Sequence, residues 1–184
     1  MPSNNSVVKL NIIQHMRFFL IGFMGSGKSH WGQQLSREFK MPYIDLDEAI
    51  VQDMNMDITE IFSRFGEEYF RKKEKELLEK LVLEHPSLIL SCGGGTPCFF
   101  NNIEFMKASG TVVWLNTRVE VLLERLIEGR KNRPVLKDIA DADLKDTIIR
   151  KLNERRMYYD QAHIVIDNES SISTGKFIQT ILHA

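Results

Sequence analysis

One run of eight residues constrains the fold and chemistry of this chain more than any other stretch. Residues 22–29 read Gly-Phe-Met-Gly-Ser-Gly-Lys-Ser and fit G-x-x-x-x-G-K-[ST], a pattern whose backbone N–H groups wrap a phosphate chain while its lysine reaches the outer end. We expect Gly22, Gly25 and Gly27 to adopt positive φ, because a Cβ would collide where the backbone approaches the anion. The pattern predicts a nucleoside triphosphate site.

The flanking residues supply the setting that such a loop requires. Residues 17–21 are a short apolar run that predicts a strand, and Trp31, Leu35 and Phe39 recur at a helical interval of four. The helix would aim the positive end of its dipole at the anion. We therefore place ATP-binding residues in and directly after the loop: Gly25, Ser26, Gly27, Lys28, Ser29 and His30.

Two of these side chains have distinct chemical roles. Lys28 brings a compact positive charge to the β- and γ-phosphates, and the Ser29 hydroxyl is small enough to bind a magnesium ion. The pattern therefore predicts Mg²⁺ as cofactor, with ATP as co-substrate.

Composition limits the size of the protein and the class of its partners. A chain of 184 residues with a 43% hydrophobic share suits one α/β domain, and a net charge of −1 provides no overall field for nucleic acid or an anionic membrane. No apolar run near 18 residues and no signal peptide is present, and the two cysteines suit a reducing compartment. We expect a cytoplasmic monomer that acts on a small molecule.

The order of elements predicts a parallel sheet. Five short apolar runs alternate with helical patterns, so the expected fold is three-layer α/β with a five-stranded parallel sheet and helices on both faces. The predicted strands are 17–21, 41–47, 87–92, 111–115 and 163–167. Residues 1–16 precede the first strand, and we interpret them as an N-terminal extension to a single domain over 17–184.

Two acids end the second predicted strand. Asp45 and Asp47 are spaced by two, which in a strand puts both on one face, where they suit metal and hydroxyl chemistry. The alternative is a pair of helix-capping acids, because residues 48–51 continue with a helical pattern.

Three later segments carry further candidates. Gly66 is expected to end one helix before a longer one over 67–84 that carries Arg71. Gly93-Gly94-Gly95 predicts a tight turn with amides facing a ligand, or else a floppy turn. The basic run 130–134 suits a mobile flap that closes on phosphate, or else an ordinary exposed turn.

Taken together, these segments resemble a known family. The loop at 22–29, Asp45-Leu-Asp47, Phe70-Arg71-x-x-Glu74, the triple glycine, Arg133-Pro134 and a late Arg155 occur in the order and at intervals similar to those of shikimate kinase. The resemblance implies a nucleoside-monophosphate-kinase-like fold with a substrate-binding lobe near 47–75 and a lid near 128–142. It also implies transfer of the ATP γ-phosphoryl group to the 3-hydroxyl of shikimate, within aromatic amino acid biosynthesis.

The resemblance also assigns roles by matching position. It implies Lys28, Asp47 and Arg133 as catalytic residues, Ser29 and Asp45 as metal ligands, and Arg125 and Arg133 as further contacts to ATP. The shikimate site would be made by Asp47, Arg71, Gly93, Gly94, Gly95 and Arg155. The late segment Arg155-Arg156-Met157 lacks the proline usual in the family, so Arg156 is an alternative ligand for the substrate carboxylate.

Two alternative functions remain. A related small-molecule kinase, such as one for gluconate, would share the loop and fold without needing the Phe70-Arg71-x-x-Glu74 and triple-glycine combination. A nucleotide-dependent switch would normally show Asn-Lys-x-Asp after the fourth strand, where this chain reads Asn116-Thr117-Arg118.

Overall fold

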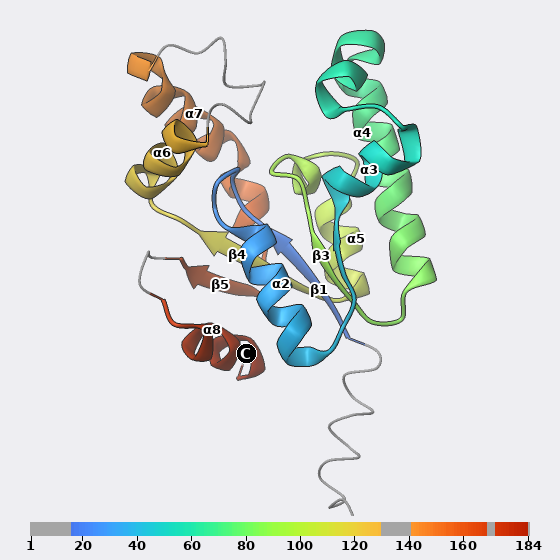
Figure 1. The fold of residues 1–184 in the computed structure, drawn as a ribbon, viewed down its shortest axis with the longest axis vertical. Coiled ribbons are helices and arrows are strands. Elements are labelled where there is room, and N and C mark those ends of the chain that lie inside the picture. Colours follow the sequence, from blue (N-terminus) through green and yellow to red (C-terminus); the bar gives the residue numbers. More distant parts are fainter. Residues whose placement is uncertain (1–15, 130–140, 169–171, 184) are drawn as a thin grey trace, which may run out of the picture.

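A five-stranded parallel sheet forms the centre of the molecule. The structure is a computed structural model that describes residues 16–129, 141–168 and 172–183 (Figure 1). All pairings are parallel and the strand order is β2-β3-β1-β4-β5. The strands are β1 (Arg17–Ile21), β2 (Tyr43–Asp45), β3 (Leu88–Ser91), β4 (Thr111–Asn116) and β5 (Ile164–Asp167). The predicted fold class is confirmed.

The connecting helices are assigned as α2 (Lys28–Phe39), α3 (Leu46–Met54), α4 (Ile58–Glu84), α5 (Asn102–Ser109), α6 (Val119–Glu128), α7 (Asp141–Tyr159) and α8 (Thr174–Leu182), with a short 3-10 helix η1 (Thr96–Cys98). In Figure 1, α6 and α7 stand on one side of the loop after β1, and α3 and α4 stand on the other. This arrangement leaves room for a site above the carboxyl ends of the strands.

Alternate residues of the buried strands face two separate cores. Phe19 and Ile21 of β1 pack with side chains of α3, α4 and α5, whereas Phe18 and Leu20 pack with side chains of α2 and α8. All four are fully or almost fully buried. Because side chains alternate along a strand, an unbroken apolar run is what a sheet covered on both faces requires.

The second predicted strand is too long. Strand β2 ends at Asp45, and Asp47 already lies in the first turn of α3. Asp45 accepts a hydrogen bond from the Asp47 N–H at 3.1 Å, so Asp45 caps the helix and the two acids do not share a strand face. The capping alternative applies to Asp45, because a carboxylate at this position satisfies an N–H that the helix itself leaves unpaired.

Gly66 interrupts α4 as predicted, although the helix resumes at once. Its φ of 79° and ψ of 171° are not helical, and α4 runs on both sides of it. The Asp57 carboxylate caps the start of α4 by accepting the Glu60 N–H at 2.8 Å. The bend separates the first two turns of α4, which pack with α3, from the long segment that carries Arg71.

Some predictions fall outside the described residues. The N-terminal extension at 1–15, Arg133 and most of the predicted lid lie there, so they remain predictions. Within the described residues, every helix is too short or too polar to cross a membrane.

Candidate functional site

The loop between β1 and α2 has the backbone conformation that the sequence predicts. Gly22, Gly25 and Gly27 have φ values of 141°, 81° and 90°. At Gly22 a Cβ would also lie 2.8 Å from the Leu115 carbonyl oxygen. The Lys28 ammonium folds back over the loop and donates to the carbonyls of Gly22 at 2.9 Å and Phe23 at 3.1 Å.

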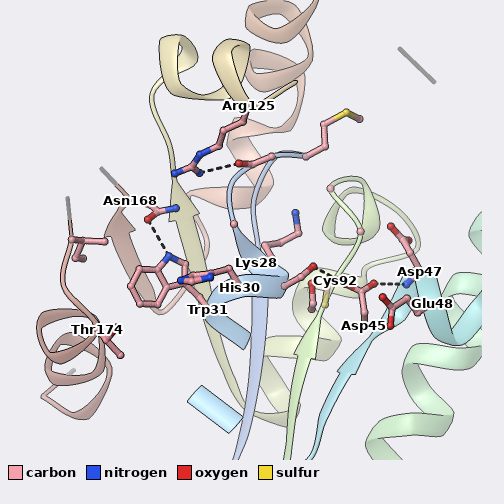
Figure 2. A pocket seen from close by; sticks show the side chains of 18 residues that line it. Lys28, His30, Trp31, Asp45, Asp47, Glu48, Cys92, Arg125, Asn168 and Thr174 are labelled. Carbon is pink, nitrogen blue, oxygen red and sulfur yellow. Dashed lines mark hydrogen bonds between the residues drawn. The ribbon is translucent and has the colours of Figure 1, made fainter. Parts of the chain in front are cut away.

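A cavity of about 1000 Å³ opens over this loop and the carboxyl ends of the strands. Six predicted site residues on the nucleotide side line it, namely Gly25, Gly27, Lys28, Ser29, His30 and Arg125. Four predicted residues of the metal and acceptor sites also line it, namely Asp45, Asp47, Gly93 and Gly94. Figure 2 shows Lys28 between Arg125 and Asn168 on one side and the acids of α3 on the other.

Ser26 does not line the cavity, although the sequence groups it with the ATP-binding residues. Its side chain is fully buried, and its N–H donates to the Phe23 carbonyl at 3.1 Å to close the turn. Ser26 therefore shapes the loop from behind.

The acidic corner joins the loop to the start of α3. The Ser29 hydroxyl donates to Asp45 Oδ2 at 3.1 Å, and the Tyr43 hydroxyl reaches the same oxygen at 3.3 Å. Burial, then the carboxylates of Asp45 and Glu74, raise the pKa of Asp47 to about 6, although Lys28 and Arg71 act to lower it. Asp47 can therefore accept or release a proton near neutral pH.

Arg71 lies in the wall behind the acidic corner. It donates from Nη1 to Glu74 Oε2 at 2.8 Å and from Nε and Nη2 to Glu67 Oε1 at 3.2 and 3.1 Å. The rings of Phe70 and Phe99 lie 5.0 and 4.5 Å from its guanidinium carbon. Three of its five N–H groups thus donate to glutamates in the described part of the chain. Arg71 is not one of the described residues that line the cavity.

Sequence reasoning assigned no role to Glu74. It is fully buried between Arg71 and Thr96, whose hydroxyl donates to Glu74 Oε1 at 2.5 Å. A buried carboxylate needs such partners to offset its lost hydration. Its spacing of three from Arg71 on a helix is the signal that could have identified the pair.

The triple glycine forms a turn against which three polar side chains pack closely. A Cβ would lie 2.9 Å from Glu74 Oε1 at Gly93, 3.0 Å from Arg155 Nη1 at Gly94, and 2.6 Å from Arg71 Nη2 at Gly95. The Gly93 carbonyl accepts the Thr96 N–H at 3.1 Å. These glycines are needed for close approach and not for positive φ, which none of the three adopts.

Two consecutive arginines at the end of α7 face in different directions. Arg155 reaches Gly94 as described and lies 5.4 Å from the Phe23 ring centroid. Arg156 pairs with Asp160 at 3.4 Å and keeps 67% of its side chain exposed. Of the two arginines, Arg155 is therefore the one that lies beside the triple glycine. Like Arg71, it lies in the cavity wall.

The nucleotide side of the cavity includes the predicted Arg125 together with residues that sequence reasoning missed, namely Asn168, Ile172 and Thr174. Arg125 donates to the Gly25 carbonyl at 3.0 Å, and Asn168 Oδ1 accepts from Trp31 Nε1 at 3.1 Å. Ile172 and Thr174, before and at the start of α8, also line the cavity. Asn168 directly follows the last strand, and a polar residue at the carboxyl end of a parallel strand is the signal that could have identified it.

Comparisons with known proteins agree with this geometry. The sequence model of the family "Shikimate kinase" matches residues 24–184. The shikimate kinase of Azobacteroides pseudotrichonymphae genomovar. CFP2 is 42% identical over 149 residues, covering 81% of this chain and 88% of its own length.

Solved structures show the same likeness. A crystal structure of shikimate kinase from Bacteroides thetaiotaomicron superposes with a TM-score of 0.83 at 33% identity, covering 91% of this chain and 95% of that one. Shikimate kinase from Acinetobacter baumannii in complex with shikimate gives a TM-score of 0.81 at 30% identity and covers 95% of each chain.

A gluconokinase from Sinorhizobium meliloti 1021 shares the fold alone, with a TM-score of 0.54 and 16% identity over 92% of this chain and 91% of that one. The likeness to shikimate kinases extends to sequence over most of the length. The chain belongs to the shikimate kinase family.

Proposed function

We infer that the protein is an ATP-dependent shikimate kinase, which forms shikimate 3-phosphate and ADP. One observation carries this conclusion beyond family membership. A single cavity joins a phosphate-binding loop and its lysine to a carboxylate with a pKa of about 6, and two arginines stand in the wall beside that carboxylate. A hydroxylated carboxylic acid is the class of acceptor that these groups complement.

The loop end would hold the triphosphate. We propose that the loop amides and Lys28 bind the β- and γ-phosphates, with Arg125 beside the adenosine. Lys28 already bridges two carbonyls of its own loop, so its ammonium is held near the expected place of the phosphate oxygens. Phosphoryl transfer needs mainly positioning and charge neutralisation, which such a cradle supplies.

The residues at the acidic corner fit a magnesium ion. Hydroxyl and carboxylate oxygens are the ligands that Mg²⁺ prefers, and Ser29 and Asp45 place two of them 3.1 Å apart. No group of three or more His, Cys, Asp and Glu suited to a metal occurs in the described ranges, which agrees with an ion that takes most of its ligands from phosphates and water. When bound, Mg²⁺ would neutralise charge on the transferring phosphates.

The opposite end would position shikimate. We propose that Asp47 accepts the proton of the 3-hydroxyl and that Arg71 and Arg155 pair with the carboxylate across the triple glycine. Arginine suits this role because two parallel N–H groups match two carboxylate oxygens. Arg133 would come from the lid to meet the transferring phosphoryl group, although it lies outside the described residues.

The wider setting completes the proposal. Cys92 and Cys98 are free thiols, which supports a reducing, cytoplasmic compartment. We also propose that the protein works as a monomer. Sedimentation at assay concentration tests this point.

A coupled ADP-release assay tests the activity. Shikimate, gluconate and nucleoside monophosphates are offered in turn with Mg·ATP, and the free acid and methyl ester of shikimate are compared. Turnover confined to shikimate, with the ester much weaker, supports the proposal. Faster turnover of gluconate would overturn it, and nucleotide binding without turnover of any acceptor would favour a switch.

A further inference from the structure

A largely buried amide in the cavity wall forms a hydrogen bond with the phosphate loop. Asn168 lies just after β5 and is 3% exposed. Its Nδ2 donates to the Ser26 carbonyl and its Oδ1 accepts from Trp31 Nε1 at 3.1 Å. One side chain thus joins the end of β5, the loop and α2.

The Ser26 carbonyl is the point where this contact acts on the loop. It also lies 3.5 Å from the buried hydroxyl of Thr117, which itself lies 3.4 Å from Asn168 Nδ2. Ser26 does not line the cavity, whereas Gly27 does. The carbonyl is therefore held toward the buried side of the loop.

The peptide plane transmits that restraint to the cavity. In a trans peptide the carbonyl and the following N–H point in opposite directions, and the described chain has no cis bonds. Fixing the Ser26 carbonyl on the buried side therefore aims the Gly27 N–H toward the cavity. Gly27, at φ 90°, has no side chain to restrict this peptide from rotating, so the restraint has to come from a neighbour.

We propose that Asn168 is a positioning residue that orients the Ser26–Gly27 peptide for phosphate binding. The proposal rests on the proposed use of ATP, but it concerns phosphate affinity and can be tested without an acceptor. According to the proposal, Asn168 affects the binding of the polyphosphate and does not affect the binding of the base.

Asn168→Ala is the main variant. It should raise the Michaelis constant for ATP and the dissociation constant for ADP roughly tenfold, because a buried carbonyl loses its partner and the peptide is freed. The Michaelis constant for shikimate should stay within about twofold. The inhibition constant of inorganic tripolyphosphate, which carries no base, should rise by the same factor as the constant for ATP.

Matched variants separate this role from others. Asn116 is an amide at the same sheet edge that donates to Asp167 at 2.8 Å, so Asn116→Ala is the control and should change no constant. Trp31→Phe removes the indole donor but keeps an aromatic ring against Phe177, which now stacks on Trp31 at 3.9 Å. Because the Asn168 contact to the Ser26 carbonyl remains, Trp31→Phe should raise the tripolyphosphate constant less than Asn168→Ala does.

The outcomes are separable. An unchanged tripolyphosphate constant with weaker ATP would mean that Asn168 contacts the base, and would overturn the proposal, as would equal losses for ATP and shikimate. Should Asn168→Ala fail to fold, Thr117→Val removes the second contact to Ser26, and we expect a smaller change in the same direction. No change for Thr117→Val in that case would also refute it. Absence of shikimate turnover with normal ADP and tripolyphosphate behaviour would count against the proposed function alone.

Discussion

The two ends of the cavity are built in different ways. The phosphate end is mostly main chain, supplied by consecutive residues 22–29. Its carbonyls accept hydrogen bonds from the loop's own Lys28 and, from outside the loop, from Arg125 and Asn168. The acceptor end is made of side chains from α3, α4, the turn after β3 and α7. Its arginines are packed against aromatic rings, and Arg71 is also paired with glutamates.

The two ends should therefore respond differently to residue changes. A backbone cradle depends on φ values and on a few side chains that orient its peptides, so most residue changes there act through geometry. The acceptor end depends on charge balance among neighbouring groups, because the buried Arg71 and Glu74 and the more exposed Asp47 influence one another over short distances. Variants that weaken substrate binding at the two ends should therefore raise different Michaelis constants.

Lys28→Ala should have the largest effect. It removes the charge that meets the phosphates and frees two loop carbonyls, so we expect kcat to fall by about a thousandfold or more. Single-turnover phosphoryl transfer measures the loss. Shikimate binding, followed by calorimetry without nucleotide, should be unchanged; a large loss of it would show that the two ends are not independent.

Asp47→Asn should follow in size. It keeps the shape but removes the proton acceptor, so kcat should fall by about 10²- to 10³-fold. In the parent enzyme, kcat/KM should rise with pH through about 6, where Asp47 loses its proton. A rate profile flat between pH 5 and 8 would remove Asp47 from this role.

Asp47→Asn also tests how much the Asp47 carboxylate lowers the stability of the folded protein. The folded pKa of Asp47 is raised from 3.8 to about 6, so native stability falls as pH rises between these values and stays lower above them. Asp47→Asn should therefore unfold at a higher temperature than the parent at pH 8, by a small margin because water reaches the exposed Asp47 side chain. The gain should vanish at pH 4.

Arg71→Ala should act on the acceptor alone. Loss of a charge-assisted pair of about 2–3 kcal/mol raises the Michaelis constant for shikimate roughly thirty- to a hundredfold, with the constant for ATP near normal. Because Glu74 would be left buried without its arginine, thermal unfolding should be measured too, and Arg71→Lys should restore much of the stability but little of the affinity. An unchanged shikimate constant would exclude Arg71 from the site.

Arg155 and Arg156 form a matched pair with the smallest effects. Arg155→Ala should raise the Michaelis constant for shikimate about tenfold, since Arg155 lies beside Gly94. Arg156→Ala should change it little, because that side chain is exposed and pairs with Asp160. The reverse order would assign the carboxylate to Arg156.

Local sequence patterns determined much of this protein. Residues 22–29 specify their own φ values and phosphate-binding backbone, because glycine positions and a following helix suffice for such a loop. The parallel sheet also follows from apolar runs that alternate with helical patterns, and Gly66 separates two helical segments as expected.

Only the tertiary structure decided how the acceptor end is assembled. Nothing local distinguishes Arg155 from Arg156, and Asp47 moved from a predicted strand into α3 because Asp45 caps that helix. The contact of Thr96 with Glu74, and the contact of Asn168 with Ser26, join residues on separate elements to a common wall or loop. Such contacts depend on where elements pack in space, and the chemistry of a side chain, including the pKa of Asp47, depends on the neighbours that packing provides.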